Sequence, residues 1–429
     1  MENLNRDLID FIDLSPTAFH TVHNVKMRLI EDGYTELFEG DKWTLERSGA
    51  YFVTKGDASL IAFRVPEDGF DGFQIAACHT DSPAFKLKPN FELTDSTYLR
   101  LSTEKYGGPV LSTWLDRPLG IAGRVMVKVG KTIESRLVAL DRDVALIPSV
   151  APHLSGEEKL SMLLDMCPLI GGKDSAGALT SLIADSIGVE KEDIVSHDLY
   201  LVNRDKGRLW GVREEFVSAP RLDDLQCVYT SLIGFLISTE EVNMPVLALF
   251  NSEEVGSTTH EGAGSAFLSN VLRRISLALG GGEEEYLRLL SNSFMVSADN
   301  AHAVHPNHPE LTDSLNKAYL NSGLVLKSNS QMRYITEGEG SAVFTQLCRM
   351  ADLPFSYYTN RSDKTGGSTL GHIAISNVPV TGVDIGLPEL SMHSAFETAG
   401  ARDSEYAVRF FETYFSSYIN KKRNTLTID

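Results

Sequence analysis

Basic side chains and long apolar runs are both scarce in this sequence. It has 39 Lys and Arg residues against 58 Asp and Glu residues, which gives a formal net charge of -19. Nucleic-acid binding needs a concentrated basic surface, and the one short basic cluster, residues 421–423, is interpreted as the exposed end of a helix. We therefore expect no nucleic-acid partner. No segment approaches the uninterrupted apolar run of about 20 residues that spans a bilayer, so we expect no membrane association.

Cysteines are also few, and nothing in their spacing suggests a zinc finger or a disulfide framework. The four lie in mostly apolar neighbourhoods, at Cys78, Cys167, Cys227 and Cys348. This pattern predicts buried free thiols. Residues 1–7 are polar and are not a basic region followed by an apolar stretch, so we expect a cytoplasmic protein.

The length of the chain and its changing periodicity predict two domains. A chain of 429 residues with 42% hydrophobic content can build more than one core, since domains usually hold about 100–200 residues. Helices and strands alternate in 1–83 and again in 217–429, where a last helix is predicted over 405–424, whereas 84–216 has the pattern of strands and turns. We expect an α/β fold with a central, mostly parallel sheet flanked by helices, formed by 1–83 and 217–429, and an inserted β-rich domain at 84–216.

Metal-binding side chains end five short segments scattered over the chain. They are His79 and Asp81, then Asp223, the pair Glu253 and Glu254, Asp299, and His393. Three of the segments follow apolar runs that are predicted to be buried strands, 73–78, 246–250 and 294–298. Ligands gather beyond the carboxyl ends of strands in an open parallel sheet, so residues far apart in sequence can meet there. The pattern favours a two-metal hydrolase.

This set contains enough ligands for a bridged pair of divalent ions. Each ion would take one histidine and one terminal carboxylate, and one aspartate would be shared between them. One acidic residue is then left over, and either Glu253 or Glu254 would act as the general base. Mixed histidine and carboxylate sites accept several ions, so Co²⁺ and Mn²⁺ remain alternatives to Zn²⁺.

The sequence resembles the aspartyl aminopeptidase family of cocatalytic dizinc peptidases nearly from end to end. The most specific of the shared motifs is the long one around Asp299. The motifs that carry the resemblance are Ser15-Pro16-Thr17, Cys78-His79-Thr80-Asp81-Ser82-Pro83, Trp114-Leu115-Asp116-Arg117, Arg221-Leu222-Asp223, Glu253-Glu254-Val255-Gly256-Ser257, Ser297-Ala298-Asp299-Asn300-Ala301-His302, Gly367-Ser368-Thr369-Leu370-Gly371 and Met392-His393-Ser394.

The resemblance implies a role for each candidate ligand. His79 and Asp299 would hold one metal, and Glu254 and His393 the other. Asp223 would bridge the two, with its two oxygens facing different ions about 3.5–4 Å apart. Glu253 would be the general base. Asp81 would accept the remaining imidazole N–H of His79 and so fix its tautomer.

The resemblance also implies a substrate site and an assembly. Lys327 and Tyr334 match family residues that recognise the side chain of the first peptide residue, Asp or Glu. His302 would hydrogen-bond the substrate carbonyl, and His153 matches a histidine of the inserted domain that reaches a site across a subunit interface. The inserted domain would serve oligomerisation, and the assembly would be a closed homo-oligomer, a dodecamer, acting on peptides.

Three departures from the family pattern lie close to these motifs. Asp224 stands where many relatives have Asn, Pro118 replaces an acidic residue, and Lys364-Thr365-Gly366 replaces a more apolar sequence. Two alternatives to an acidic aminopeptidase therefore stay open. One is a related dizinc exopeptidase or amidohydrolase of neutral specificity, and the other is a catalytically silent assembly protein on the same scaffold.

Overall fold

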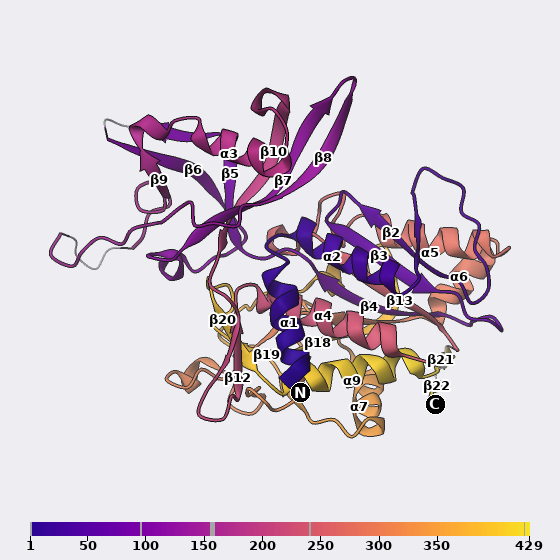
Figure 1. Ribbon diagram of the computed structural model, residues 1–429. Helices are drawn as coiled ribbons and strands as arrows, with labels where there is room; N and C mark the ends of the chain where they lie inside the picture. Colours follow the sequence, from indigo (N-terminus) through magenta and orange to yellow (C-terminus); the bar gives the residue numbers. More distant parts are fainter. Residues whose placement is uncertain (1, 95–96, 155–158, 240–241, 424) are drawn as a thin grey trace.

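A nine-stranded mixed sheet forms the centre of the molecule (Figure 1). The computed structural model describes residues 2–94, 97–154, 159–239, 242–423 and 425–429. In spatial order the strands are β1 (Thr35–Leu37), β2 (Ala50–Lys55), β3 (Ser59–Arg64), β13 (Met244–Phe250), β4 (Phe73–His79), β14 (Phe294–Ala298), β18 (Thr381–Gly386), β16 (Leu324–Lys327) and β17 (Phe355–Tyr358). The α/β fold class predicted from the sequence is confirmed.

Most neighbouring strands of this sheet are parallel. The pairs β1–β2, β13–β4, β4–β14, β14–β18 and β16–β17 run parallel, whereas β2–β3, β3–β13 and β16–β18 are antiparallel. Phe250 of β13 lies opposite His79 of β4, so these two strands end level with each other. The carboxyl ends of β4, β13 and β14 therefore share one edge, where ligands collect in parallel sheets.

Helices cover both faces of the large sheet (Figure 1). Successive strand residues point to opposite faces, so Leu247 and Leu249 of β13 join one core while Val246 and Ala248 join the other. The first core is shared with α1 (Glu2–Asp13), α2 (Ala18–Glu31), α4 (Leu222–Ile237), α7 (Gly338–Met350) and α9 (Asp403–Ser416), and the second with α5 (Phe267–Ala278), α6 (Glu283–Ser291) and α8 (Leu370–Ala374).

A separate six-stranded sheet lies at the upper left of Figure 1. All of its neighbouring strands are antiparallel, and α3 (Ala178–Ile187) packs on its core through Leu179 and Ile183. In spatial order the strands are β8 (Thr132–Ala139), β7 (Leu119–Val129), β10 (Ile194–Asn203), β5 (Ala84–Thr94), β6 (Tyr98–Tyr106) and β9 (Leu169–Gly172). These strands all lie within the range 84–203.

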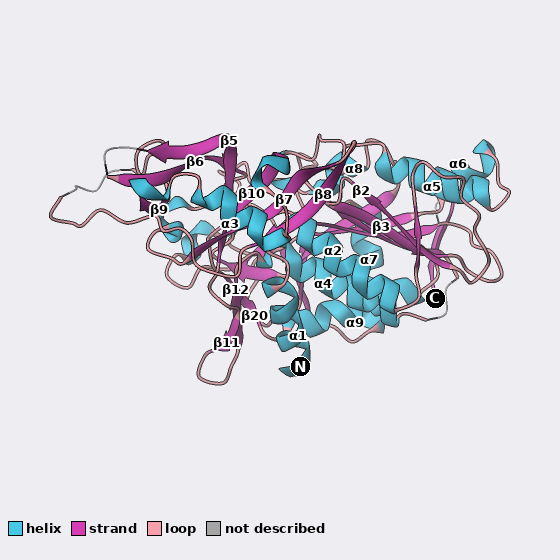
Figure 2. Ribbon diagram, turned by 45° about the horizontal axis from the view of Figure 1, so that its top comes forward, coloured by secondary structure: helices cyan, strands magenta, loops and turns pink. Residues whose placement is uncertain are grey.

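A smaller third sheet connects distant parts of the chain beside the large one. Its order is β11 (Arg208–Trp210), β12 (Phe216–Ala219), β20 (Glu397–Gly400), β19 (Pro388–Leu390) and β15 (Ala301–His302). In Figure 2, β11 projects with β12 and β20, away from the six-stranded sheet. The chain therefore leaves the six-stranded sheet after β10 and joins the third sheet from residue 208 onward.

The predicted helix over 405–424 is wrong beyond Ser416, and residue 424 lies outside the described residues. Helix α9 ends at Ser416, and β21 (Ile419–Lys422) then pairs antiparallel with β22 (Thr425–Ile428). The carbonyl of Ile419 accepts a hydrogen bond of 2.6 Å from Asn243 Nδ2, which ties this segment to the main domain as a strand. The basic residues 421–423 are thus not the end of a helix.

The cysteines are free, as predicted. Cys78, Cys227 and Cys348 are buried, whereas Cys167 is only half-buried. Within the described part of the chain, no helix combines the length and apolar character needed to cross a bilayer.

Candidate active site

A cavity of about 480 Å³ opens at the carboxyl edge of the large sheet. His79 ends β4, and Asp299 follows β14 directly. Glu253 and Glu254 begin η4 (Glu253–Val255), a 3₁₀ turn just after β13. Nine of the residues singled out in the sequence line this cavity: His79, Asp223, Glu253, Glu254, Asp299, His302, Lys327, Tyr334 and His393.

Asp223 lies between the two histidines. Its Oδ1 is 3.3 Å from His79 Nε2, and its Oδ2 is 3.5 Å from His393 Nε2. His393 Nε2 is in turn 3.4 Å from Glu254 Oε1. The two oxygens of one buried carboxylate therefore face two different imidazoles, which is the arrangement that a bridging ligand requires.

The possible ligand atoms form two groups that share Asp223. One group is His79, Asp223 and Asp299, and the other is Asp223, Glu254 and His393. Within each group the ligand atoms lie within 4.8 Å of one another. A further overlapping group contains His79 with Glu253 and Glu254. Imidazole nitrogens and carboxylate oxygens are the usual ligands of divalent zinc, so the donor set fits such ions.

The hydrogen bonds of the two histidines leave the same ring nitrogen of each available as a ligand. His79 Nδ1 lies 3.0 Å from the Asp81 carbonyl oxygen, and His393 Nδ1 lies 3.2 Å from the Gly108 carbonyl oxygen. A carbonyl can only accept, so each Nδ1 carries a proton and each Nε2 is the ring nitrogen left to face Asp223. Although burial opposes it, neighbouring carboxylates, Asp223 among them, raise the pKa of both histidines, that of His393 to about 10, so without a metal each Nε2 carries a proton toward Asp223.

The carboxylates of this cluster repel one another. Burial and the neighbouring carboxylates of Asp299 and Asp81 raise the pKa of Glu253 to about 8. Burial and Asp223 also raise the pKa of Glu254. Glu254 Oε1 and Asp223 Oδ1 are buried without a hydrogen-bond donor. Buried acceptors of this kind are costly unless they are paired or coordinate a metal, so the residues present fit a bound cation.

Asp81 holds the loop that carries the two glutamates. Its carboxylate accepts hydrogen bonds from the main-chain N–H groups of Glu253 and Glu254, at 3.1 and 3.2 Å. The nearer acceptor for His79 Nδ1 is the carbonyl of Asp81, since its carboxylate Oδ1 is 3.6 Å away. Asp81 therefore orients His79 mainly through its main chain and the glutamates through its side chain.

Lys327, Tyr334 and His302 line the same cavity as the candidate ligands. Lys327 is buried, and its Nζ lies 5.7 Å from the centre of the Tyr334 ring. His302 is exposed at the cavity, but the desolvation there, together with the charge of Lys327, lowers the pKa of His302, so this imidazole stays neutral over a wider pH range. The Lys327 cation is paired with Asp299 at 2.8 Å, and its remaining N–H donors, beside a neutral His302, are suited to bind an anionic ligand.

Two candidates do not line this cavity: Asp81, which is hydrogen-bonded to the glutamates that do, and His153. His153 lies on an exposed part of the segment between β8 and β9, within the described residues 140–154. A role in the site of the same chain is therefore not supported by its position.

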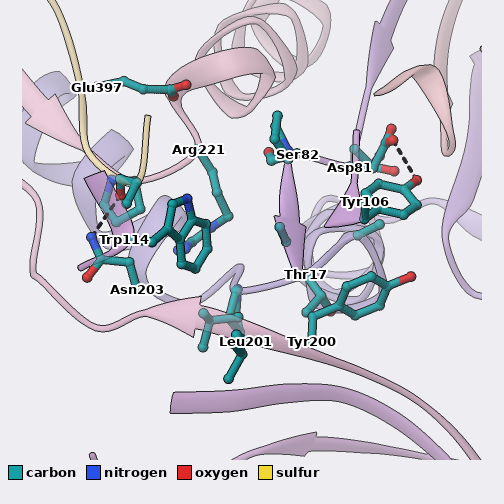
Figure 3. Close-up of a pocket in the computed structure, with 18 of the residues that line it drawn as sticks. Thr17, Asp81, Ser82, Tyr106, Trp114, Tyr200, Leu201, Asn203, Arg221 and Glu397 are labelled. Carbon is teal, nitrogen blue, oxygen red and sulfur yellow. Dashed lines mark hydrogen bonds between the residues drawn. The ribbon is translucent and has the colours of Figure 1, made fainter. Parts of the chain in front are cut away.

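Sequence reasoning missed a buried glutamate that holds two of the candidate ligands. Glu397 accepts a 2.7 Å hydrogen bond from the main-chain N–H of His393 and a 3.1 Å bond from that of Asp223. It borders a smaller cavity behind the site, together with Arg221, Ser82 and Asp81 (Figure 3). The sequence does place Glu397 four residues after His393, but one carboxylate downstream of a histidine is too common a pattern to identify it as a site residue.

Asp224 is a second buried carboxylate beside the ligands. Its Oδ2 accepts a 3.1 Å hydrogen bond from the main-chain N–H of His79. Burial raises the pKa of Asp224, and Oδ1 is left without a donor. The departure at this position therefore adds a carboxylate next to His79 but leaves its side chain bound to the main chain.

The fold and the site together define a metal-dependent hydrolase of the α/β class. A family model described as Aminopeptidase I zinc metalloprotease (M18) matches residues 11–415. The chain belongs to the M18 family of zinc metalloprotease aminopeptidases, as the resemblance in its motifs predicted, and is thus a hydrolase.

Relatives and solved structures agree with this assignment over nearly the whole chain. The chain is 42% identical to a probable M18 family aminopeptidase 2 from Clostridium acetobutylicum, covering 96% of this chain and 98% of the relative. A probable M18 family aminopeptidase 2 from Mycobacterium leprae is 38% identical over 96% and 98%. A chain in the cryo-EM structure of the Ape4 and Nbr1 complex superposes with a TM-score of 0.94 at 35% identity, covering 97% of this chain and 86% of that one.

Proposed function

We propose that this protein is an aminopeptidase that binds two divalent ions, with zinc as the first candidate. The observation that carries the proposal is the pair of ligand groups that share Asp223. His79 and Asp299 would complete one ion site, and Glu254 and His393 the other. When bound, such ions lower the pKa of a water molecule and polarise the carbonyl of the peptide bond.

Glu253 is proposed as the general base. The side chain of Glu253 lines the cavity beside the ligands. The hydrogen bonds to Asp81 are made by the main-chain N–H groups of Glu253 and Glu254, so they do not involve this side chain. Its carboxylate would take the proton of the attacking water and return it to the departing amine. Asp81 would hold Glu253 and Glu254 in position relative to His79, so we propose it as a residue that supports catalysis.

The substrate is proposed to be a peptide with Asp or Glu at its amino terminus. Lys327 and Tyr334 would contact the acidic side chain, and His302 would hydrogen-bond the substrate carbonyl. The net charge of -19 repels acidic peptides at long range, so selectivity has to come from this buried cation at short range. The charge of Lys327 is less screened there than it would be at the surface.

Assembly is proposed to be a homo-oligomer, in the form of a dodecamer. A related chain, 28% identical with a TM-score of 0.85 and 96% coverage of both chains, comes from a structure titled as an S. cerevisiae mApe1 dodecamer. Division into a catalytic domain (1–83 and 217–429) and an inserted oligomerisation domain (84–216) is part of this proposal, supported by the separate six-stranded sheet. His153 would act at a neighbouring subunit's site. Cytoplasmic location stays a prediction.

An aminoacyl substrate panel tests the reaction and its specificity together. The metal-free protein would be reconstituted with Zn²⁺, Co²⁺ or Mn²⁺ and assayed on aspartyl, glutamyl, leucyl and acyl-amino-acid substrates. We expect release of amino-terminal Asp and Glu. Preference for neutral or acylated substrates would favour the related exopeptidase or amidohydrolase, and no turnover with any ion would favour the silent assembly protein.

The bridging role is tested separately by Asp223→Ala. This change removes a ligand from both ions, so the number of ions bound per chain should fall and activity should vanish. Retention of two tightly bound ions with normal turnover would remove the bridging assignment.

A further inference from the structure

The turn that follows β6 of the six-stranded sheet lies against the candidate metal ligands. We call residues 106–110, which begin with the last residue of β6, the ligand-facing turn. Val110 N donates a 2.9 Å hydrogen bond to the carbonyl of His393, while His393 Nδ1 donates to the Gly108 carbonyl at 3.2 Å. Both the main chain and the ring of this histidine are therefore held by the inserted domain.

The two glycines of the turn leave no space for side chains on the metal side. Gly107 has φ +67°, and a Cβ added there would lie 3.0 Å from Glu254 Cβ and 3.1 Å from Glu254 Oε2. A Cβ at Gly108 would lie 3.3 Å from His393 Nδ1. These distances are tighter than ordinary contacts, so a side chain at either position would displace Glu254 or His393.

Tyr106 connects the same turn to the glutamate loop. Its hydroxyl donates a 2.7 Å hydrogen bond to Asp81 Oδ2, as Figure 3 shows, and Asp81 in turn accepts the main-chain N–H of Glu254. Burial and the charge of Asp81 raise the pKa of Tyr106, so this hydroxyl keeps its proton and remains a donor.

The inserted domain also holds the chain just after His393. Asn203 Nδ2 donates a 2.7 Å hydrogen bond to the carbonyl of Ala395, and the N–H of Ala395 donates to Thr113 Oγ1 at 2.8 Å. Asn203 appears with this bond in Figure 3. Residues 393–395 are therefore pinned to the inserted domain at both ends, although their chain belongs to the other part of the molecule.

We propose that the ligand-facing turn completes the metal site of Glu254 and His393, so that the inserted domain positions one of the two ions in addition to any role in assembly. The inference rests on the proposed two-ion function. Its residues act through Glu254, His393 and Asp81 and are positioning residues. Because Gly107 and Gly108 approach Glu254 and His393, replacing either should weaken the Glu254–His393 ion more than the His79–Asp299 ion.

The test compares Gly107→Ala with Gly130→Ala. Gly130 connects β7 and β8 of the same sheet, has φ +61°, and a Cβ added there meets nothing within 4 Å. Both variants therefore suffer similar backbone strain, and only one presses on a ligand. Ions bound per chain would be measured by elemental analysis after dialysis, and the affinity of each by competition with a chromophoric chelator. We expect Gly107→Ala to bind one ion about 10- to 100-fold more weakly, as when groups that orient metal ligands are changed.

Two further variants keep the test decisive if Gly107→Ala does not fold. Gly108→Ala places a Cβ against His393 Nδ1 and does not start from a left-handed conformation. Tyr106→Phe removes the bond to Asp81, and its control is Tyr200→Phe, because the Tyr200 ring packs 5.6 Å from the Tyr106 ring. Both tyrosines line the same cavity. We expect Gly108→Ala and Tyr106→Phe to weaken one ion, and the control variants to bind as the parent does.

The outcomes separate this inference from the function on which it rests. Two tightly bound ions in the parent and in Gly107→Ala, Gly108→Ala and Tyr106→Phe alike would overturn the role of the turn and leave the two-ion function intact. A parent that binds a single ion would overturn both. Equal melting temperatures of metal-free Gly107→Ala and Gly130→Ala, with weaker metal binding only in the former, would support the inference and exclude a general loss of fold.

Discussion

Lys327 Nζ donates a hydrogen bond of 2.8 Å to Asp299 Oδ1, a bond between a buried cation and a candidate metal ligand. Although burial opposes it, the charge of Asp299 and its hydrogen bond raise the pKa of Lys327, so the side chain stays charged. A lysine paired in this way can both hold Asp299 toward an ion and present its remaining N–H donors to a substrate carboxylate. The two roles predict different substrate dependence.

Lys327→Ala should reduce activity on acidic substrates more than on neutral ones. A hydrogen bond to a charged group contributes about 1.5–3 kcal/mol, which corresponds to a loss of roughly ten- to over a hundredfold in kcat/KM for aspartyl and glutamyl substrates. Because Asp299 loses its partner, neutral substrates should also lose some activity. Steady-state kinetics on matched aspartyl and leucyl substrates, with the metal content of each preparation, measure both effects. An equal loss on both substrates would assign Lys327 to Asp299 alone.

Glu253→Gln should separate proton transfer from metal binding. The amide keeps the shape of the side chain but cannot accept the proton, and loss of a general base costs about 100- to 10,000-fold. We expect two bound ions and a strongly reduced kcat. Glu254→Gln is the matched neighbour, and it should lose metal because Glu254 Oε1 faces His393 Nε2 at 3.4 Å. If the two variants showed the opposite behaviour, the roles of the two glutamates would have to be exchanged.

The strand ends and the ligand types could be predicted from sequence because both leave local signals. Apolar runs mark β4, β13 and β14, and each is followed by a residue that can bind metal. Which of Glu253 and Glu254 acts as base came only from the family resemblance, since adjacent carboxylates look alike in sequence. Non-local contacts left no such signal: the approach of Gly108 to His393 joins residues 285 positions apart. The end of α9 was missed because the hydrogen bond that holds Ile419 comes from Asn243, which is far away in the sequence.

His20 should make stability fall at acidic pH. It is buried, and its Nδ1 lies 2.9 Å from Thr17 Oγ1. Burial lowers the pKa of His20 to about 4, with smaller contributions from the charges of His23 and Arg221. The unfolded chain binds a proton near pH 6.5 and the folded chain does not, so this contribution is intact above pH 6.5 and is lost as the pH falls toward 4.

His20→Gln removes the titrating group and keeps a hydrogen-bonding side chain. Its free energy of unfolding, measured by urea titration between pH 7 and 4.5, should fall less steeply than that of the parent. Other groups titrate in the same range, and comparing the two proteins cancels them. Equal pH slopes in parent and variant would show that His20 is protonated without cost in the folded protein.

Glu397→Gln should weaken both ions, because the carboxylate of Glu397 accepts main-chain N–H bonds from Asp223 and His393 at once. An amide has one acceptor oxygen, so one of these N–H groups loses its partner and the ligand it carries can shift. Asp403 offers the matched control: it is also fully buried and accepts main-chain N–H bonds from Asn321 and Gly323, at 2.7 and 2.9 Å, and neither is a candidate ligand. Asp403→Asn therefore makes the same chemical change with the same loss of an acceptor, away from the ions.

Thermal unfolding of the metal-free variants and chelator competition of the reconstituted ones distinguish a metal role for Glu397 from a merely structural one. Both variants should lose stability, since a buried N–H left without a partner costs about 1–3 kcal/mol. Only Glu397→Gln should lose metal affinity, by about 10- to 100-fold, as is typical when a group that orients metal ligands is changed. Excess metal should then restore part of its kcat, whereas Asp403→Asn should not respond to metal. Equal metal affinity in the two variants would reduce Glu397 to an ordinary buried carboxylate that stabilises the fold.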